Sequence, residues 1–583
     1  MKRTLLTGFF FFAFQFTGLS QTNNWTNLLT GNWHDLSWSL GIRPLSNQWV
    51  KVTNSGSKAV IVNSTTRDSH RTSMTVSNLS LSAPLGATNT VLLNFTGTAV
   101  PLTVLNRCYV GTNGVLLNLF AKLTIGKTDQ VSLVVEGGTV TQNGGSNICP
   151  GYCELGTDSG FGRYNLSNGV FQVGSLDLNS DGGGHYEQSG GQTLAGDIYI
   201  GSHPNDASFS VSNGTVRTGW IGLRGGEFTQ TNSDVFCSNS ISISMGSNYR
   251  MSGGSLASLR TSLGEGSDAF MSQSGGTFQT GPLRVGADTI YNTATFRMNG
   301  GSLFATEIRR GVGGIISQSG GTISVQGEID GGIFQSGGLL MSSNTYLSDY
   351  LEFTFVQTGG TNITTNTFVD YQGFTLLNGR LDVGNLVVGA DFFHKGGTLT
   401  NRGQIIFRGG RLFPTLPQEF FGAINVELDS NLIFPSNNCV MRFAPSANIA
   451  WDGHFYFGAF IPSLKIDNWK GSTNGGGMHQ IIVGTNGLTA NQLEQIVFVN
   501  PAGLPAGGYN GKILNSGELV PTTTLRLSLR NTTEGPLLRW PGRQTLQSAT
   551  NVNGPYTNVV TDFNFYRMTV QTNQPKRFFR LKN

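Results

Sequence analysis

The sequence predicts an all-β fold, a right-handed parallel β-helix, which is a solenoid whose coils stack along one axis. The first observation behind this prediction is a short phrase that returns along the chain: Gln or an apolar residue, a small polar residue, then Gly-Gly or Asn-Gly. It appears at 188–191, 273–276, 318–321 and 335–338. The last glycines of successive copies are about 21 residues apart on average, a spacing typical of solenoids.

Composition and local pattern supply two further observations. Glycine accounts for 81 of 583 residues and charged residues for 12%, whereas charged residues are usually about 25%. Runs such as Val91–Phe95 and Val131–Val135 alternate like short strands between turn residues. A repeat this short cannot bury its own apolar face, so the coils must stack. The glycines expected at corners with positive φ are Gly191, Gly276, Gly321 and Gly338.

Residues 1–20 are expected to be an export signal. Lys2 and Arg3 form a positive start, an apolar stretch runs to Phe16, and small residues precede Gln21, where we expect cleavage. No later segment has the roughly 18 uninterrupted apolar residues of a membrane span. The sequence therefore predicts a secreted or cell-surface protein with no membrane span after signal cleavage.

Residues 21–69 are expected to form a Trp-rich cap and the first coils. The first coil of a solenoid has an open end that must be covered, and Trp33, Trp38 and Trp49 supply large apolar side chains near it. The alternative is that these rings are exposed in a row and stack on sugars. The two interpretations differ in whether the three side chains are buried.

The repeat domain is expected to span residues 70–413. Pro414 and Pro417 interrupt the pattern, because proline cannot donate to a strand ladder. Residues 414–520 are then expected to form a small β-sandwich module. Within this module Thr489, with Gln492 three residues later, predicts a capping box that opens one short helix.

Residues 521–583 are expected to be a last β module, in which Lys and Arg outnumber Asp and Glu. Its strands are expected near 525–530, 536–540, 545–549 and 577–581. The positive charge favours the solvated faces of short strands over a dedicated acidic partner. The net charge of the whole chain is only +4, which gives no case for a nucleic-acid partner.

The five cysteines are interpreted as local features at most. Cys149 and Cys153 lie in a turn-rich stretch and can close a short loop between them. Cys108 is about two coils away, roughly 9.6 Å, which exceeds the reach of a disulfide. Further ligands at zinc spacing do not accompany the pair, so no metal is expected.

The best candidates for catalysis lie in one segment and comprise Asp177, Asp181, His185 and Glu187. Converging carboxylates with a nearby base are what glycoside hydrolysis requires. Asp181 precedes three glycines, however, and an Asx-turn explains it without catalysis. We therefore expect no catalytic residue, cofactor or metal. The alternatives are a carbohydrate-active β-helix enzyme (polysaccharide lyase or glycosidase) using this segment, and a carbohydrate-binding protein without catalysis.

Three stretches resemble known bacterial families. The phrases at 211–216 and 273–278 resemble the autotransporter-associated β-strand repeats of surface proteins. The stretch 464–469, together with 487–498, resembles a module that precedes the anchor in many PEP-CTERM-type exported proteins. The segments 546–556 and 577–581 resemble C-terminal modules of large secreted proteins from the Verrucomicrobia. The chain lacks the Pro-Glu-Pro anchor, and its C-terminal part is too short for an autotransporter barrel.

These features together predict an exported rod at the cell surface or in the extracellular matrix. The resemblance implies export and a surface role but no reaction. Asn, Ser, Thr and Gln on repeated turns suit weak, multivalent contact with polysaccharide or other matrix components. The predicted role is structural, adhesive or glycan-contacting.

Overall fold

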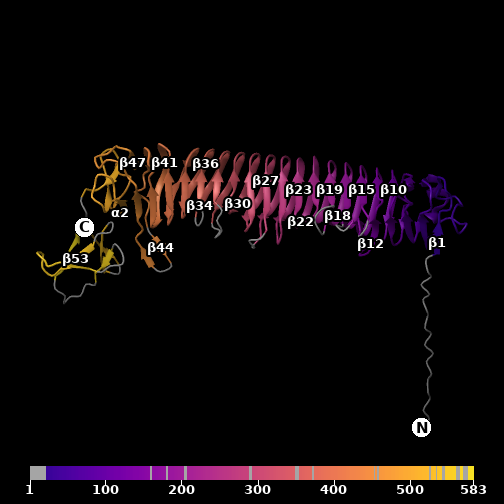
Figure 1. Cartoon of the computed structure of the whole chain (residues 1–583), viewed down its shortest axis with the longest axis horizontal. Helices are drawn as coiled ribbons and strands as arrows, with labels where there is room; N and C mark the ends of the chain where they lie inside the picture. The colour runs from indigo at the N-terminus through magenta and orange to yellow at the C-terminus, as the bar shows by residue number, and fades with distance from the viewer. Residues whose placement is uncertain are drawn as a thin grey trace, which may run out of the picture. The chain divides into compact units, whose positions relative to one another are not determined.

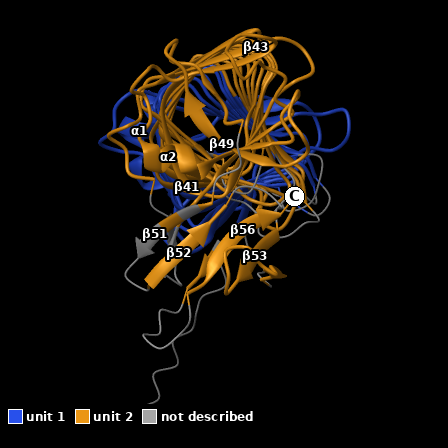
Figure 2. Ribbon diagram, turned by 90° about the vertical axis from the view of Figure 1, so that its left-hand side faces the viewer, with its two compact units in different colours: residues 1–229 blue, residues 230–583 orange. Residues whose placement is uncertain are grey.

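The structure is a computed structural model. It describes residues 21–157, 160–178, 182–201, 207–287, 292–347, 354–369, 373–451, 453–455, 458–523, 527–532, 535–540, 545–559, 565–568 and 576–582. The expected signal, residues 1–20, lies outside these ranges. The chain divides into two compact units, residues 1–229 and 230–583, which Figure 2 shows in different colours.

Unit 1 is a parallel β-solenoid made of two strand ladders. Its first sheet contains β1 (Gln21–Asn24), β3 (Gln48–Val52), β5 (Thr75–Val76), β6 (Asn78–Leu81), β8 (Leu102–Val104), β9 (Cys108–Val110), β11 (Lys122–Ile125), β12 (Val131–Val135), β14 (Ser146–Leu155), β16 (Val170–Leu178), β18 (Gln192–Ile200) and β20 (Thr215–Arg224). Its second sheet contains β2 (Gly31–Asn32), β4 (Lys58–Asn63), β7 (Asn89–Asn94), β10 (Gly114–Asn118), β13 (Thr139–Gln142), β15 (Gly162–Leu166), β17 (Gly184–Gln188), β19 (Ser208–Val211) and β21 (Glu227–Gln230).

Unit 2 repeats the arrangement. Its first sheet contains β22 (Ser233–Ser244), β24 (Gly254–Leu263), β26 (Thr277–Val285), β28 (Ser302–Arg310), β30 (Thr322–Asp330), β32 (Leu339–Tyr346), β34 (Thr361–Val369), β36 (Arg380–Val388), β38 (Thr398–Asn401), β39 (Gln404–Arg408), β41 (Gln418–Leu428), β43 (Cys439–Ala444) and β47 (His479–Ile482). Its second sheet contains β23 (Ser247–Met251), β25 (Ala269–Gln273), β27 (Ala294–Met298), β29 (Gly314–Gln318), β31 (Phe334–Gln335), β33 (Phe355–Gln357), β35 (Phe374–Leu376), β37 (Asp391–His394), β40 (Arg411–Pro414), β42 (Ser430–Ile433), β46 (Leu464–Asp467) and β48 (Ile496–Val499).

The predicted parallel solenoid is confirmed, with coils of about 22 residues. In unit 1, for example, Val170 lies opposite Gln192 on the next coil, and Gln192 lies opposite Thr215. Figure 1 shows β15 and β19 within one stack of strands, and likewise β23 and β27. Side chains alternate between the interior and the outer face along each strand, so like residues stack coil on coil.

Aromatic rings form such a stack inside unit 1. Tyr164, Tyr186, Phe209 and Phe228 are all fully buried on successive coils. Their ring centroids are 5.4 Å, 4.6 Å and 4.7 Å apart in that order. In unit 2, Phe374 stacks between two further phenylalanines in the same way, at 4.6 Å and 5.3 Å. Burying rings of this size supplies much of the apolar area of a thin coil.

The corner glycines have the predicted conformation. Gly191, Gly276, Gly321 and Gly338 have φ of 70°, 71°, 69° and 76°. A Cβ on Gly276 would also lie 2.5 Å from the carbonyl oxygen of Gly254, the corresponding corner of the preceding coil. Glycine is therefore required here for two reasons, its left-handed backbone and the close approach of the neighbouring coil.

Where the phrase begins with Gln, that side chain ties the corner to the next coil. Gln273 is fully buried, and its Nε2 donates to Gly276 O at 3.2 Å and to Ser302 O at 3.0 Å. Gln318 repeats the arrangement on the carbonyl of its own corner glycine and on Leu339 O. The side chain satisfies two carbonyls at the turn, which explains why Gln recurs.

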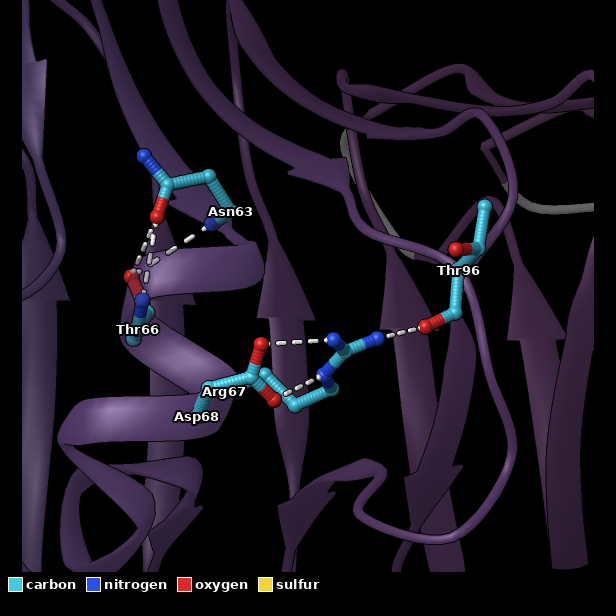
Figure 3. Close-up of polar contacts among 5 residues, drawn as sticks. All are labelled: Asn63, Thr66, Arg67, Asp68 and Thr96. Atoms are coloured by element: carbon cyan, nitrogen blue, oxygen red, sulfur yellow. Dashed lines mark hydrogen bonds and ion pairs between the residues drawn. The ribbon is translucent and has the colours of Figure 1, made fainter.

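A short helix that the sequence did not predict lies near the start of unit 1. Helix α1 (Ser64–Ser69) is followed by the 3₁₀ helix η1 (Arg71–Met74). Figure 3 shows how α1 begins: the side chain of Asn63 accepts a hydrogen bond from Thr66 N in a capping box. Arg67 pairs with Asp68 and also donates to Thr96 O, which ties α1 to a loop of a later coil.

The ladders continue past the boundary expected at residue 413. Pro414 belongs to β40 and lies opposite His394. Beyond it β42, β46 and β48 pair in parallel, so this stretch begins as further coils rather than as a separate sandwich. Proline is tolerated because the pairing of β40 with the next strand, β42, ends at Leu412, so Pro414 is not required to donate to that strand.

The parallel order ends after β48. Strand β49 (Gly508–Ile513) pairs antiparallel with β48, and β50 (Leu519–Pro521) pairs antiparallel with β49. Helix α2 (Ala490–Gln495) lies just before this change, capped by Thr489 and Gln492 as predicted. A two-stranded hairpin, β44 (Gly453–Phe455) with β45 (Gly458–Phe460), precedes α2 in the chain.

The last residues form two small antiparallel sheets. One contains β51 (Ser528–Thr532), β52 (Gly535–Arg539) and β55 (Phe565–Arg567); the other contains β53 (Thr545–Ala549), β54 (Thr557–Asn558) and β56 (Phe578–Lys582). Leu538, Trp540 and Leu546 form their buried cluster. Strands β51, β52, β53 and β56 fall close to the four ranges that the sequence predicted, whereas β54 and β55 were not predicted.

Candidate functional site

The structure separates the residues that the sequence proposed for catalysis. Asp177 lies on β16 in the first sheet, whereas His185 and Glu187 lie on β17 in the second sheet. Asp181 lies outside the described residues. The neighbours of Asp177 are consequently found on adjacent coils of the first sheet and not within its own segment.

His185 and Glu187 lie on the outer face of the second sheet and have contacts that are ordinary for a protein surface. His185 Nδ1 hydrogen-bonds to Ser208 on the next coil, and its ring lies 5.7 Å from that of Phe161. Partial burial, followed by the positive charge of Arg163, lowers the pKa of His185. Glu187 is exposed. Among the residues described, this part of the second sheet has a base but no converging pair of carboxylates.

Asp177 belongs to a different group of outward-facing side chains, which we call the acidic–aromatic face. It consists of Tyr152, Glu154, Asp177, Asp197, Tyr199 and Trp220. All six come from four consecutive coils of the first sheet in unit 1, on β14, β16, β18 and β20. The face therefore gathers three carboxylates and three aromatic rings on one side of the unit.

Strand register builds the acidic–aromatic face as two adjacent columns. In one column Tyr152, Ser175, Asp197 and Trp220 lie opposite one another in turn. In the other, the order is Glu154, Asp177, Tyr199 and Gly222. Neighbouring parallel strands are about 4.8 Å apart, so the face extends over roughly 14 Å along the stack.

Gly222 leaves room for the indole ring of Trp220 at one end of the face. The indole of Trp220 lies against Gly222, where an added Cβ would be 1.7 Å from a ring carbon. The ring centroids of Tyr199 and Trp220 are 4.8 Å apart, with the planes inclined at 50°. Trp220 is thus held against the strand backbone with part of its surface in solvent, and Tyr199 lies beside it.

Burial first, and neighbouring negative charge second, raise the pKa values of Asp177 and Tyr199. Desolvation, together with the charge of Glu154, raises the pKa of Asp177 from 3.8 to about 6. Burial and then the charge of Asp197 raise the pKa of Tyr199, while Arg224 acts in the opposite direction. Both causes at Asp177 favour the protonated form of its carboxyl group.

A buried hydroxyl in the face has no hydrogen-bond partner among the described residues. Ser175 stands between Tyr152 and Asp197 in register, on the same side of the strand as Asp177. Its side chain is only 7% exposed, and its Oγ makes no hydrogen bond to them. A buried hydroxyl left unpaired costs about 1–3 kcal/mol, so a ligand group that reached Ser175 would satisfy a polar atom that the fold leaves open.

Part of this face was visible in the sequence. The sequence drew attention to Asp177 but not to Tyr199 and Trp220, because they lie one and two coils later. The signal that could have found Tyr199 is a repeated phase: Asp177 and Tyr199 each stand between two buried aliphatic residues near the end of a strand. Aligning successive coils by that phase places the two side chains next to each other.

The tryptophans near the N-terminus do not form an exposed row. Trp33 and Trp38 are 0% and 2% exposed, and Trp38 packs edge to face with Trp25 at 5.0 Å and with Trp33 at 5.3 Å. Trp49 differs, because 39% of it is exposed and its Nε1 donates to Ser80 Oγ at 2.8 Å. Grouping Trp49 with the other two was therefore wrong, since it faces outward from β3.

The cysteines are buried as free thiols, including the two for which a short disulfide was considered. Desolvation raises the pKa of Cys108 and Cys149 to about 12 and raises that of Cys153 well above its usual value. Within the described ranges, no three His, Cys, Asp or Glu side chains come together as possible metal ligands. None of the helices described is long and apolar enough to cross a membrane.

Comparison of the chain with models of protein families, with curated proteins and with solved structures found no match in any of the three.

Proposed function

We propose that this protein is exported and serves as a non-catalytic solenoid scaffold at the cell surface or in the extracellular matrix, where it contacts glycans. The observation that carries the proposal is the acidic–aromatic face. Partly exposed rings such as those of Tyr199 and Trp220 suit the apolar faces of sugar rings, and carboxylates accept hydrogen bonds from sugar hydroxyls.

The interior of the solenoid supports a scaffold role. Its amide side chains hold corner carbonyls and its rings stack on one another, so these groups serve cohesion between coils. Each added coil extends the same outer faces, and repeated weak contacts along such faces add up to high avidity. The N-terminal signal pattern of residues 1–20 supports export.

Binding and hydrolysis are tested together on the purified chain beginning at Gln21. A panel of polysaccharides is screened for binding by co-sedimentation, and each bound glycan is assayed for release of reducing ends. We expect binding to at least one glycan, weakened by Trp220→Ala, and no release of reducing ends. If the protein binds none of the glycans on the panel, the proposal is contradicted.

A second candidate function, glycoside hydrolysis, has one specific observation in its favour. Glu154 and Asp177 stand opposite each other on adjacent coils, and Asp177 has a pKa of about 6. Hydrolysis needs one protonated and one ionised carboxyl group flanking the bond. Release of reducing ends that disappears in both Asp177→Asn and Glu154→Gln would establish this function in place of the first.

Export is tested separately. Residues 1–20 are fused to a reporter that is active only outside the cytoplasm, and the same fusion with Lys2 and Arg3 replaced by Glu serves as control. We expect reporter activity from the native segment and much less from the control. Equal activity from both, or none from either, would count against export by this segment.

A further inference from the structure

The charge of the acidic–aromatic face restricts which glycan it suits. Glu154, Asp177 and Asp197 contribute three carboxylates over adjacent coils. Arg224 acts on Tyr199 and offsets part of this charge. The balance of these four groups is negative, so uronic acids and sulfated sugars are repelled.

The arrangement of rings and carboxylates suits a cation attached to a flat apolar body. An ammonium group gains both from a carboxylate and from the face of an aromatic ring. Asp197 stands opposite Trp220 in register, and Asp177 stands opposite Tyr199. Each of these two rings therefore has a carboxylate on the adjacent coil.

Two further features indicate that the face is built for a ligand. Trp220 rests against Gly222, where any side chain would collide with the indole. The ring therefore already has a defined position before a ligand binds, which lowers the entropy cost of binding. The buried Oγ of Ser175 lacks a partner among the described residues and lies between Tyr152 and Asp197 in register. A hydroxyl group of a sugar can supply the missing hydrogen bond.

We infer that the acidic–aromatic face binds a polysaccharide whose sugars carry free amino groups. This inference rests on the proposed function and names the ligand class of the same surface. Sugar rings stack on Tyr199 and Trp220, and the ammonium groups pair with Asp177 and Asp197. Tyr152, three coils from Trp220 and 43% exposed, provides a third aromatic contact along the same chain of sugars.

The test uses the chain beginning at Gln21 and four soluble hexamers, with binding measured by calorimetry at low and moderate salt. These are β-1,4-linked glucosamine, the same hexamer fully N-acetylated, β-1,4-linked glucose, and lysine. We expect the glucosamine hexamer to bind at least about tenfold more tightly than each of the other three, because only it combines charge with sugar faces. Its affinity should fall as salt rises.

Variants locate the binding. Trp220→Ala and Asp197→Asn should each weaken binding of the glucosamine hexamer about tenfold, with unchanged circular dichroism and melting showing that the fold is intact. Trp49→Ala is the matched control: Trp49 is exposed on the same sheet of unit 1, but the ammonium of its own neighbour Lys51 lies 4.1 Å from the ring centroid. It should leave binding unchanged.

The outcomes separate the two proposals. Equal affinity for the acetylated or glucose hexamer would overturn the preference for amines and leave glycan contact standing. Equal affinity for the lysine hexamer, or loss of binding in Trp49→Ala but not in Trp220→Ala, would overturn the assignment of this face. Failure to bind any of the three sugars, together with a negative glycan panel, would overturn the proposed function itself.

Discussion

At the scale of single residues, Asp177 shows how the solenoid can hold a carboxyl group in an unfavourable position. It has a pKa of about 6 in the folded protein, compared with 3.8 ordinarily. Its backbone register opposite Glu154 is imposed by the ladder, so the two negative charges are kept on adjacent coils. A perturbed carboxyl group of this kind on a surface is more typical of binding than of stability.

Asp177→Asn is expected to stabilise the protein at neutral pH. Because the folded-state pKa is raised, the folded chain binds more protons than the unfolded chain between about pH 4 and 6, and the free energy of unfolding falls as pH rises through that window. The substitution removes this fall in the free energy of unfolding, which amounts to about 1–2 kcal/mol after allowance for solvent screening. Melting temperatures at pH 4, 6 and 8 measure it.

The gain in melting temperature for Asp177→Asn should be largest at pH 8 and vanish near pH 4. Glu187→Gln, at an exposed carboxylate on the other sheet, controls for loss of a charge alone. An equal gain at all three pH values, or the same gain in the control, would contradict the role of desolvation at Asp177.

The cysteines give a second prediction at this scale. All five thiols are buried, and desolvation raises the pKa of Cys439, like that of Cys108 and Cys149, to about 12. Thiolates are the reactive form, so the native protein should not react with a thiol reagent at pH 8, while the protein unfolded in guanidinium should react at all of its cysteines. Rapid reaction of any cysteine in the native state would show that its coil opens.

At the scale of the element, the recurring phrase is a complete corner. Its glycine provides the left-handed turn, and its Gln holds the corner carbonyl and one carbonyl of the following coil, as Gln273 does for Gly276 and Ser302. The role of the glycines follows from the sequence, because few residues adopt positive φ. The role of the Gln does not, since its partner Ser302 is 29 residues away and only the register of the coils brings it near.

The sequence did not predict helix α1 or the continuation of the ladder through Pro414, and both failures have physical reasons. Helix α1 has six residues, too few to show a helical period, and its capping box is the main local signal. Pro414 looked like a break, but it pairs with the preceding coil, and the pairing of β40 with the following strand already ends at Leu412, so no N–H is missed there. The acidic–aromatic face was only partly visible because its members lie on four coils.

A pair of glycine substitutions tests what each corner requires. Gly276 and Gly266 both have positive φ, at 71° and 77°, but a Cβ meets the preceding coil only at Gly276, since nothing lies within 4 Å at Gly266. Gly266→Ala should cost about 1 kcal/mol through backbone strain alone. Gly276→Ala should cost about 2–4 kcal/mol, because the neighbouring coil must also move.

Urea unfolding of the two variants beside the native chain measures both values. Equal destabilisation by Gly266→Ala and Gly276→Ala would show that close packing between coils contributes nothing at this corner. A negligible effect of both would contradict the positive φ itself.

At the scale of the whole molecule, cohesion comes from contacts between successive coils, and among the described residues β1 and β2 pair only with the coil that follows them. In unit 1 the buried cluster of Trp25, Trp33 and Trp38 lies in this first part of the chain. Strands β3 and β4 then carry the two ladders onward to β6 and β7. An uncovered strand edge at this position would be a template for pairing with another molecule.

Deleting residues 21–55 should therefore make the protein aggregate. The deletion removes the Trp cluster together with β1, β2 and β3, and leaves the edges of β4 and β6 unpaired. Light scattering and size-exclusion chromatography at several concentrations measure the effect, with Trp49→Ala as a control that keeps the cluster. A deletion variant that stays monomeric with an unchanged melting temperature would contradict a covering role for this segment.

The way Gln joins the coils also bears on how such a gene can change. Gln318 binds its own corner at Gly321 and a backbone carbonyl, that of Leu339, on the following coil. A backbone carbonyl is present whatever residue stands there, so any coil of similar length is an acceptable successor. In-frame duplication or loss of one whole repeat in the DNA would leave the same hydrogen bonds between the coils that become neighbours. The number of repeats can therefore change among descendants of this sequence without loss of these bonds.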